Sequence, residues 1–532
     1  MIVQAMLRKS KVPRSRRDEI EHLFQDHADG KTTLSASGLL RFLHQEQKEF
    51  LADEDTAEAL IDRYEIETAE SRSMTFEGFF RYMESKDCCV FDQAHTSVYQ
   101  DMDQPLSSYF ISSSHNTYLT RGQLVGESHL HGYVSALKKG CRCVEIDCWD
   151  GLDMEPVVYH GYTLTSKILF KEVIEIVSQH AFEVSAFPLI LSLENHCCEE
   201  QQEVVAQYLI SILGDKLLRS TLDNPTNGDL PSPNKKKVKV AQALSDLVIY
   251  TRSVKFVSFR HSEDNQTSYE NTSIAEKRAR KLMKASGKDF VQHTQRFLCR
   301  IYPAGSRIYS SNYNPQEFWN VGAQLVALNF QTLGLPMDLN NGRFLDNGGC
   351  GYVLKPAVLL HRERSFDPNS SQHHHLKEAQ VVMYGSNLPS LEPGKALNPF
   401  VRVEVHGIPS DSRTKNTHTV KNNSLSPHWN AEMNFRIRVP ELCLIRFSVH
   451  DQNTLFKSEF VGQYTLPFTS LKKVMLSVCV MQVPFHPSSP PSGYRWVPLL
   501  SKDGCSLDPA SLFVWVWYSQ KQPSKVASKY RV

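Results

Sequence analysis

Four short apolar runs, each ending in a polar cluster, follow one another between Ser112 and Glu194. They read SSSHNTYL, CRCVEIDCWDG, EPVVYHGYTLTS and LILSLENH. In a parallel α/β barrel, side chains at the carboxyl ends of the strands point into one mouth, where reactions take place. The runs therefore predict a shared pocket that gathers two histidines, an asparagine and three carboxylates: His115, Asn116, Glu145, Asp147, His160 and Glu194.

These residue types indicate a particular chemistry. Carboxylates held together repel one another, so they need a cation or must keep a proton. Oxygen-only ligands favour a hard ion, calcium or magnesium, over zinc. We expect the asparagine and the three carboxylates to form a calcium cradle, which leaves the histidines free for proton transfer or for stabilising negative charge. That pairing fits phosphoryl chemistry, although each residue taken singly could be a core histidine or a capping acid.

The rest of the sequence places this stretch in a split barrel. Strand-like and helical runs alternate over residues 97–225, which is the pattern of βα units and a parallel sheet. The segment STLDNPTNGDLPSPNKKKVKV then has the composition of a surface linker. The α/β pattern resumes at ALSDLVIYT and continues to GCGYVLKPAVLL. Neither half alone has enough strands to close, so a single interrupted (β/α)8 TIM-type barrel accounts for both.

Different patterns flank the barrel. Residues 15–87 place apolar side chains three or four apart, which predicts two helix-loop-helix pairs. The first loop keeps Asp26, Asp29 and Gly30 but offers Ser or Ala where a calcium loop needs oxygen ligands, so we interpret this lobe as structural. After about residue 370, short β-branched and aromatic runs predict an antiparallel sandwich. The triplet at residues 373–375, three histidines, is interpreted as junction linker.

Composition limits the functional classes. With 532 residues the chain is too long for one core, and its net charge of +1 gives no general attraction to nucleic acid. The 12 cysteines lack paired CxxC spacing, which indicates free thiols in a reducing cytosol. The start, MIVQAMLRKSKVPRSRR, reverses the order of a secretion signal, and no apolar run approaches the roughly 20 residues that span a bilayer. We expect a soluble or peripherally attached protein.

The order of these motifs, continued by RIYPAGSR, NPQEFWNVGAQLVALNFQT and NGGCGYVLKP, resembles eukaryotic phosphoinositide-specific phospholipase C over nearly the whole chain. The resemblance implies an α-helical EF-hand-like lobe, a barrel of X and Y halves, and a C-terminal C2 domain, an antiparallel β-sandwich. It is nearest the delta and zeta branch. The zeta type fits best because no β-rich lipid-binding (PH) module precedes the helical lobe, and because VAQALSDLVIYT and YENTSIAE are present.

The implied division of the chain has eight parts. They are an N-terminal tail (1–14), the EF-hand-like lobe (15–95), the X half (96–225), a shortened X–Y linker (226–240), the Y half (241–366), a linker (367–376), the C2 domain (377–520) with an insertion (474–492), and a C-terminal tail (521–532).

The activity implied by the resemblance is calcium-dependent hydrolysis of phosphatidylinositol 4,5-bisphosphate. The products are diacylglycerol and inositol trisphosphate, formed through a cyclic phosphodiester, and they generate intracellular calcium signals. For the zeta type this implies a role in egg activation at fertilization. The expected partner is a phosphoinositide-containing membrane surface, with no nucleic acid and no obligate protein partner. The implied location is cytoplasmic with peripheral membrane association, and a nuclear or perinuclear location stays open.

The resemblance also assigns roles to the pooled residues. Asn116, Glu145, Asp147 and Glu194 would bind Ca2+, and Glu145 would take the proton of the inositol 2-hydroxyl as that group attacks the phosphodiester in line. His160 would protonate the departing diacylglycerol oxygen. His115 would stabilise the pentavalent phosphate.

Further positions match the substrate and membrane contacts of the family. Ser273, Arg300 and Tyr302 would hold the 4-phosphate and stack on the inositol ring, and a guanidinium suits a bidentate phosphate contact. Leu124, Tyr162 and Leu164 would form an apolar ridge that dips into the bilayer. On its other side Arg280 and Ser306 replace apolar residues, which would shift binding towards anionic headgroups.

One departure from the family bears on activity. The family follows LPSP with a strand that carries two phosphate-binding lysines, whereas LPSPNKKKVKVAQAL here leads almost directly to the Y half. Lys237 or Lys239 is a hypothetical substitute. Without two charge-assisted contacts of roughly 1.5–3 kcal/mol each, efficiency would fall on the order of a hundredfold or more. The alternative is a catalytically silent phosphoinositide- or membrane-binding scaffold. A glycerophosphodiester hydrolase is a weaker reading, because it leaves the sandwich and the Y-half motifs unexplained.

Two further departures lie in the C2 region. Asn398 and Asn453 stand where calcium-binding members carry aspartates, and Asp451 alone cannot bind calcium usefully, so we expect calcium-independent docking or a purely structural sandwich. Residues 474–492 interrupt the family pattern between SLKK and GYR. With the missing strand and the truncated first lobe, this inserted loop indicates an alternative or imperfect transcript.

Overall fold

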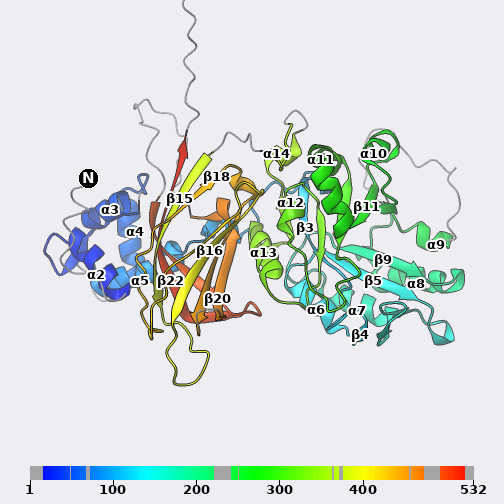
Figure 1. Cartoon of the computed structure of the whole chain (residues 1–532), viewed down its shortest axis with the longest axis horizontal. Coiled ribbons are helices and arrows are strands. Elements are labelled where there is room, and N and C mark those ends of the chain that lie inside the picture. Colours follow the sequence, from blue (N-terminus) through cyan, green and yellow to red (C-terminus); the bar gives the residue numbers. More distant parts are fainter. Residues whose placement is uncertain are drawn as a thin grey trace, which may run out of the picture. The chain divides into compact units, whose positions relative to one another are not determined.

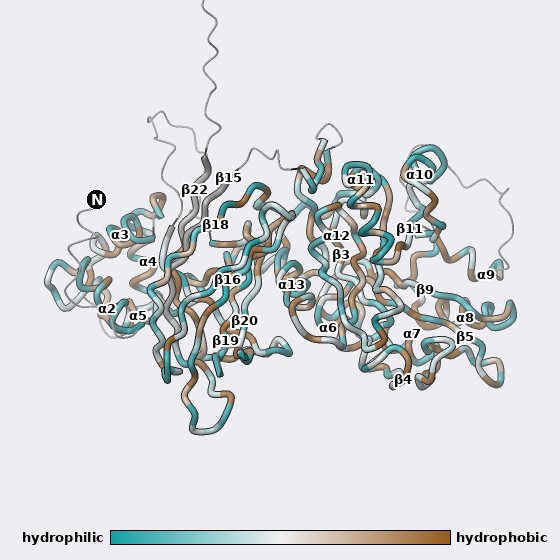
Figure 2. The backbone as a smooth tube through the Cα atoms, in the orientation of Figure 1, coloured by the Kyte–Doolittle hydropathy of each residue, from teal (hydrophilic) through white to brown (hydrophobic). Residues whose placement is uncertain are grey.

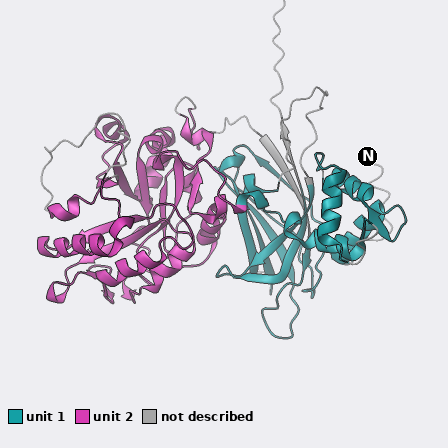
Figure 3. Cartoon of the chain, turned by 180° about the vertical axis from the view of Figure 1, so that it is seen from behind, with its two compact units in different colours: residues 1–95, 371–532 teal, residues 96–370 magenta. Residues whose placement is uncertain are grey.

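A computed structural model divides the chain into two compact units, residues 1–95 with 371–532 and residues 96–370 (Figure 3). The residues that it describes are 16–47, 49–66, 72–220, 241–249, 251–361, 365–370, 376–453, 457–472 and 492–521. Both tails, the X–Y linker with Lys237 and Lys239, the histidine triplet and nearly all of the predicted insertion lie outside the described residues.

The first unit begins with the helical lobe. Its described helices and strands are α2 (Arg16–His27), β1 (Thr33–Ser35), α3 (Ala36–Gln45), α4 (Glu54–Tyr64), β2 (Ser73–Thr75) and α5 (Phe76–Glu84). Two of the helices begin where a hydroxyl accepts a backbone N–H, from Gly38 to Ser35 and from Gly78 to Thr75. The short strands pair antiparallel between these pairs of helices. This is the predicted pair of helix-loop-helix motifs.

The first loop of the lobe does not present a free acidic ligand at Asp29. Arg41 Nη2 lies 2.6 Å from Asp29 Oδ2, and the same guanidinium nitrogen donates to the carbonyl of His27. The hydrogen bond from Arg41 keeps the pKa of Asp29 below its usual value. This ion pair agrees with the interpretation of the lobe as structural.

The same unit contains an eight-stranded antiparallel sheet, the C2 sandwich, with the strand order β17-β16-β19-β20-β21-β22-β15-β18. Its strands are β15 (Leu376–Ser386), β16 (Pro399–His406), β17 (Arg413–Asn416), β18 (Met433–Ile437), β19 (Leu444–Gln452), β20 (Ser458–Pro467), β21 (Ser492–Leu500) and β22 (Ser506–Lys521). Buried and exposed residues alternate strictly along β18, as expected for a strand with one face on a core. Figure 2 colours the backbone by hydropathy, with apolar and polar stretches interspersed along the chain.

The helical lobe and the sandwich share a hydrophobic core. Phe513 of β22 is fully buried among the apolar side chains of the lobe. Polar contacts surround it: Gln47 Nε2 donates to the carbonyl of Tyr494, and Trp496 Nε1 donates to the carbonyl of Ser85. The two sequence-distant parts therefore bury each other's apolar surface.

The second unit is built on parallel strands joined by helices, which lie outside the sheet (Figure 1). The parallel strands are β3 (Tyr109–Ser114), β5 (Cys143–Trp149), β9 (Ile190–His196), β10 (Arg252–Val254), β11 (Glu270–Ala275), β12 (Leu298–Tyr302) and β13 (Leu325–Leu328). The principal helices are α6 (His131–Lys138), α7 (Phe170–His180), α8 (Glu199–Leu213), α11 (Glu276–Arg296) and α13 (Leu335–Phe344). Strands of the X and Y halves alternate with helices, as the sequence predicted.

Short elements complete this unit. They are β4 (Val125–Gly126), β6 (Val157–Val158), β7 (Leu164–Thr165), β8 (Ile168–Leu169), α9 (Gln242–Ser245), α10 (Phe259–Asn265), α12 (Gln316–Trp319), β14 (Tyr352–Leu354) and α14 (Ala357–Leu360).

Strand pairing joins the two barrel halves and also shows where the sheet stops. The parallel order is β9-β5-β3-β13-β12-β11-β10, so β13 of the Y half pairs with β3 of the X half. Among the described residues, β9 pairs only with β5 and β10 pairs only with β11. An eight-stranded barrel would place one more strand between these edges. The chain between β9 and β10 includes residues 221–240, which lie outside the described residues and hold the LPSP segment after which the sequence predicts that the lysine-bearing strand is missing.

Candidate active site

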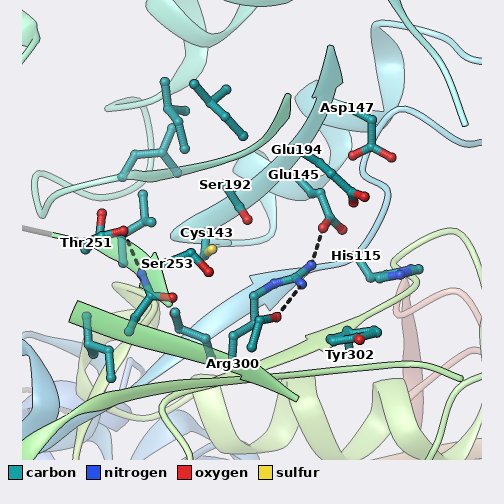
Figure 4. A pocket seen from close by; sticks show the side chains of 18 of the residues that line it. His115, Cys143, Glu145, Asp147, Ser192, Glu194, Thr251, Ser253, Arg300 and Tyr302 are labelled. Carbon is teal, nitrogen blue, oxygen red and sulfur yellow. Dashed lines mark hydrogen bonds and ion pairs between the residues drawn. The ribbon is translucent and has the colours of Figure 1, made fainter. Parts of the chain in front are cut away.

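The polar strand ends identified in the sequence meet at one cavity of about 1700 Å3. His115 and Asn116 directly follow β3, Glu145 and Asp147 lie on β5, and Glu194 lies on β9. Figure 4 shows the side chains of these strands converging. Every predicted catalytic, metal-binding and substrate-binding residue lines this cavity: His115, Asn116, Glu145, Asp147, His160, Glu194, Ser273, Arg300 and Tyr302.

Three carboxylates form the most highly charged part of the cavity. Oxygen atoms of Glu145, Asp147 and Glu194 lie within 4.8 Å of one another. Tyr118 Oη donates to Asp147 Oδ2 at 2.5 Å, while Asp147 Oδ1 is buried and has no hydrogen-bond partner among the described residues. An unpartnered carboxylate oxygen beside two other carboxylates is an oxygen-rich arrangement that suits a hard divalent cation. The residues present therefore fit calcium.

The backbone of Asn116 brings this residue to the same cluster. Its φ of 40° is in the left-handed region, which asparagine tolerates better than most residues. The turn aims the backbone N–H of Asn116 at Glu145 Oε2, at 2.8 Å. A left-handed residue two positions after β3 thus places the Asn116 backbone beside Glu145.

The environment drives the pKa values of two neighbouring carboxyls apart. Burial raises the pKa of Asp147 well above its usual range, and the charges of Glu145 and Glu194 raise it further. Burial also acts to raise the pKa of Glu145, but Arg300, His115 and the N–H of Asn116 overcome it and lower that pKa. Glu145 is therefore ionised at neutral pH, whereas Asp147 readily keeps a proton until a cation is bound.

Each histidine is oriented by an oxygen atom on its Nδ1 side. His115 Nδ1 lies 2.9 Å from Asn329 Oδ1, and His160 Nδ1 lies 2.7 Å from the backbone oxygen of Gln123. Burial lowers the pKa of His115, and Glu145 partly opposes this effect. Both imidazoles therefore line the cavity with one nitrogen engaged and the other available to a substrate.

Arg300 connects the carboxylate side of the cavity with the predicted substrate side (Figure 4). Its Nη1 donates to Ser273 Oγ at 3.2 Å, and its Cζ lies 5.6 Å from the centre of the Tyr302 ring. Its Nη2 forms a short ion pair with Glu145 Oε1. Ser273, Arg300 and Tyr302 are thus neighbours, as predicted, and Arg300 also holds Glu145, which sequence reasoning did not anticipate.

The cavity extends beyond the edges of β9 and β10 that pair with no further strand among the described residues. Apolar side chains of α7, α8 and the following turn line this part, including Val177, Ala181, Leu209, Leu213 and Leu217. Lys216, whose Nζ donates to the carbonyl of Ser178, also lines the cavity, whereas Lys237 and Lys239 lie outside the described residues. Glu194, on the edge strand β9, has a side chain that is 58% exposed.

The three predicted ridge residues are exposed, with relative accessibilities of 47% for Leu124, 95% for Tyr162 and 80% for Leu164. Two segments hold the ridge together, because β4 and β7 pair and Leu164 N donates to the carbonyl of Leu124. Tyr162 has a φ of 59°, an unusual conformation for a bulky residue. Val125 (66% exposed) and Tyr309 (84%) are also exposed apolar residues, and the sequence did not single them out.

Arg280 differs from the prediction that it attracts anionic headgroups. It pairs with Glu276 Oε2 at 3.1 Å and with Glu317 Oε2 at 2.6 Å, and its side chain is only 31% exposed. Two carboxylates therefore balance its charge. Ser306 is exposed and adds no charge.

Asp451 of the C2 domain is buried and hydrogen-bonded. Asp451 is 3% exposed, and its Oδ1 accepts the backbone N–H of Asn398 at 2.6 Å. Its carboxylate thus ties β19 to the segment before β16. Buried in this way, Asp451 is not presented as a calcium ligand.

Sequence reasoning missed three polar residues that orient the site: Tyr118, Gln123 and Asn329. Tyr118 and Gln123 lie in the loop after β3, and Asn329 directly follows β13. The position of Asn329 at a strand end is the same signal that identified the other residues, and it could have been found in the run LVALNFQT. Tyr118 and Gln123 carry no comparable signal.

No helix in the described part of the chain is long and apolar enough to cross a membrane. The chain matches four family models in order. They are the EF-hand-like domain of phosphoinositide-specific phospholipase C (14–93), the phosphatidylinositol-specific phospholipase C X domain (102–241) and Y domain (244–358), and the C2 domain (380–480).

Curated relatives match almost the entire chain. The 1-phosphatidylinositol 4,5-bisphosphate phosphodiesterase zeta-1 of Homo sapiens is 45% identical over 94% of this chain and 88% of its own length. The delta-4 enzyme of Xenopus laevis is 43% identical over 94% of this chain and 72% of its own. The crystal structure of S. officinalis PLC21 covers 97% of this chain and 69% of that chain, with a TM-score of 0.82 at 30% identity.

Proposed function

Because the chain belongs to the phosphoinositide-specific phospholipase C family, we propose that it hydrolyses phosphatidylinositol 4,5-bisphosphate to diacylglycerol and inositol trisphosphate in this cavity. The observation that carries the proposal is the convergence of three carboxylates and two oriented histidines, with Asp147 Oδ1 left without a hydrogen-bond partner among the described residues. Relatives of both the zeta and delta types are named for this activity.

Asn116, Glu145, Asp147 and Glu194 are the residues that would hold calcium. When bound, the ion supplies charge that neutralises the carboxylates and stabilises negative oxygen on the substrate. The fit rests on the donor set, because every side chain of the four offers an oxygen atom.

Glu145 is the proposed general base for the inositol 2-hydroxyl. Its lowered pKa keeps it ionised and so able to accept a proton. Both of its oxygens are engaged, Oε2 by the N–H of Asn116 and Oε1 by Arg300. A proton taken on Oε1 would weaken the ion pair of Glu145 with Arg300. A substrate phosphate beside Ser273 offers that guanidinium an alternative anion.

The two histidines serve the phosphoryl group and the leaving oxygen. His160 donates from Nδ1 to the Gln123 carbonyl, so it would act in its doubly protonated form, in which Nε2–H can protonate the departing diacylglycerol oxygen. His115 donates from Nδ1 to Asn329 and would likewise carry a second proton on Nε2 to stabilise charge that develops on the phosphate. The cyclic inositol phosphate would then be opened by water, with the same groups acting in reverse.

Membrane contact is the second part of the proposal. The exposed residues Leu124, Tyr162 and Leu164 lie at the cavity mouth, since Leu124 and Tyr162 also line the cavity. Their insertion among lipid headgroups would bring the opening to the substrate. We propose peripheral association with phosphoinositide-containing membranes from the cytoplasm. Egg activation remains the physiological role expected of the zeta type.

The test is release of inositol phosphates from vesicles that contain phosphatidylinositol 4,5-bisphosphate, across a calcium titration, with His115→Ala as the control. We expect calcium-dependent release that the substitution abolishes. No release at any calcium concentration would refute the enzyme assignment. Binding to the vesicles without release would identify the silent scaffold. Among the described residues β9 and β10 each lack a partner strand on one side, at the place where the sequence predicts that the lysine-bearing strand is missing.

A further inference from the structure

We propose that Gln123 is a positioning residue that fixes the orientation of the Asn116 amide and the tautomers of both histidines. The inference deepens the proposed phospholipase function and rests on it for its effect on turnover. Gln123 is 7% exposed, and its side-chain oxygen and nitrogen as well as its backbone N–H and carbonyl all have partners inside the site.

A backbone carbonyl decides which groups donate and which accept in this hydrogen-bond network. Ser310 Oγ donates to the carbonyl of Arg121 at 2.6 Å, and a carbonyl can only accept. The single hydroxyl proton of Ser310 is thereby used, so Ser310 Oγ must accept from Gln123, 2.9 Å away. This determines which end of the Gln123 amide is which, with Nε2 facing Ser310 and Oε1 on the opposite side.

One branch of the network then reaches the proposed metal site. Because Gln123 Oε1 can only accept, the group 2.8 Å away must be Asn116 Nδ2. The amide of Asn116 therefore turns its nitrogen towards Gln123, and Oδ1 is the end left for a cation. A reversed Asn116 amide would present N–H groups to the cation, which repel it.

The other branch reaches His115. Gln123 Nε2 also lies 3.2 Å from Asn329 Oδ1, which accepts from it. The same oxygen lies 2.9 Å from His115 Nδ1, so this ring nitrogen must donate. His115 is thereby held with its proton on Nδ1, and Nε2 is its variable atom. The donor and acceptor of every hydrogen bond are therefore fixed along the path from Arg121 through Ser310, Gln123 and Asn329 to His115.

The main chain of Gln123 holds the second histidine. Its carbonyl accepts from His160 Nδ1 at 2.7 Å, and its N–H donates to the carbonyl of Ile308 at 2.8 Å. The Ile308 contact and the side-chain bonds fix where that carbonyl lies. One residue therefore sets the tautomer of His160 through its backbone and that of His115 through its side chain.

The decisive substitution is Gln123→Glu. It keeps the shape of the side chain but replaces the donor Nε2 with an oxygen that can only accept. The added oxygen would face Ser310 Oγ and Asn329 Oδ1, and two acceptors repel. Asn329 relieves this by turning its amide, which presents Nδ2 to His115 and moves the histidine proton to Nε2. Asn116 Nδ2 still has an oxygen acceptor at position 123 in this variant, because the substitution leaves Oε1 in place. We expect kcat to fall about 10–100-fold, with KM and the calcium requirement changed by less than about threefold.

Two further variants distinguish a positioning role of Gln123 from a purely structural one. Gln123→Met removes the acceptor for Asn116 as well, so we expect it to raise the calcium concentration for half-maximal activity, which Gln123→Glu leaves unchanged. Gln331→Glu is the matched control, because Gln331 Nε2 also donates to the Arg121 carbonyl. Gln331 is half-buried, and among the described residues it bonds to no residue of the site. We expect Gln331→Glu to retain wild-type kcat. Equal losses of kcat in all three variants would overturn the proposal.

The readout independent of activity is the 15N NMR spectrum of the imidazoles in the metal-free, full-length protein labelled at histidine. We expect both His115 and His160 to carry the proton on Nδ1, with signals assigned by single His→Gln variants. In Gln123→Glu, His115 should change to the Nε2–H form while His160 stays the same. An Nε2–H form of His115 in the unsubstituted protein overturns the proposal, even if the Gln123 variants fail to fold. These shifts are measured without substrate, so an inactive chain would refute the proposed function and not this inference.

Discussion

Asp147→Asn should stabilise the calcium-free protein and abolish most of its stabilisation by calcium. The carboxylate oxygens of Asp147 and Glu145 lie within 4.8 Å of each other, and both residues are buried. Two unit charges at that distance repel by about 3.5 kcal/mol at an effective dielectric constant of about 20. Asp147 avoids part of this cost by keeping its proton, so we expect a gain of about 1–2 kcal/mol.

The measurement is thermal unfolding with chelator and with calcium. A gain of that size raises the midpoint by about 2–8 °C in a domain of this length. Calcium at a hundred times its dissociation constant should add about 2.7 kcal/mol to the unsubstituted protein and little to Asp147→Asn. The matched control is Asp215→Asn, because Asp215 is exposed and lies outside the cavity. Equal calcium shifts in all three proteins would refute the assignment of this cluster as the calcium site.

The pH dependence of the free energy of unfolding is a second test of the role assigned to Asp147. The pKa of Asp147 is raised in the folded state, so above the ordinary aspartate pKa the folded protein binds more protons than the unfolded chain. The free energy of unfolding therefore falls as pH rises from that value through the folded pKa. We expect this decline in the calcium-free protein, and we expect Asp147→Asn to lessen it. An identical decline in both proteins would assign the effect to other groups.

Three further predictions test separate parts of the molecule. Tyr118→Phe removes the 2.5 Å hydrogen bond to Asp147, so calcium affinity should fall about 10–100-fold in calorimetry, and unchanged affinity would contradict the role given to that bond. Leu164→Glu should weaken vesicle binding in sedimentation assays without changing hydrolysis of a soluble substrate, because Leu164 is 80% exposed and is not one of the reacting groups. An equal loss of vesicle binding and of soluble-substrate hydrolysis would indicate damage to the cavity instead. Burial lowers the pKa of Lys355 well below its usual value, and its Nζ donates to the backbone carbonyl of Thr294. Between the folded and unfolded pKa values the unfolded chain binds more protons, so stability rises with pH, and Lys355→Met should flatten that rise in urea titrations at several pH values.

The sequence by itself determined the fold class and the chemical character of the site. A parallel strand is encoded by a short apolar run, and the polar residue that ends the run necessarily lies at the sheet's carboxyl edge. SSSHN, VEID and LSLENH therefore identified His115, Glu145, Asp147 and Glu194 without any knowledge of packing. The same local logic distinguished the helical lobe from the sandwich, because helical and strand periodicities are readable over roughly 18 residues or fewer.

The tertiary structure decided how these groups are paired and protonated. Arg300 and Glu145 are separated by 155 residues, and Gln123 and Asn329 by 206, so no local pattern predicts that they touch. The opposite pKa shifts of Glu145 and Asp147, which sit two residues apart on β5, depend on which neighbours arrive from other strands. Hydrogen bonds and charge interactions act over a few ångströms of space, whatever the separation along the chain. Residue identity therefore follows from sequence, while orientation and protonation follow from the fold.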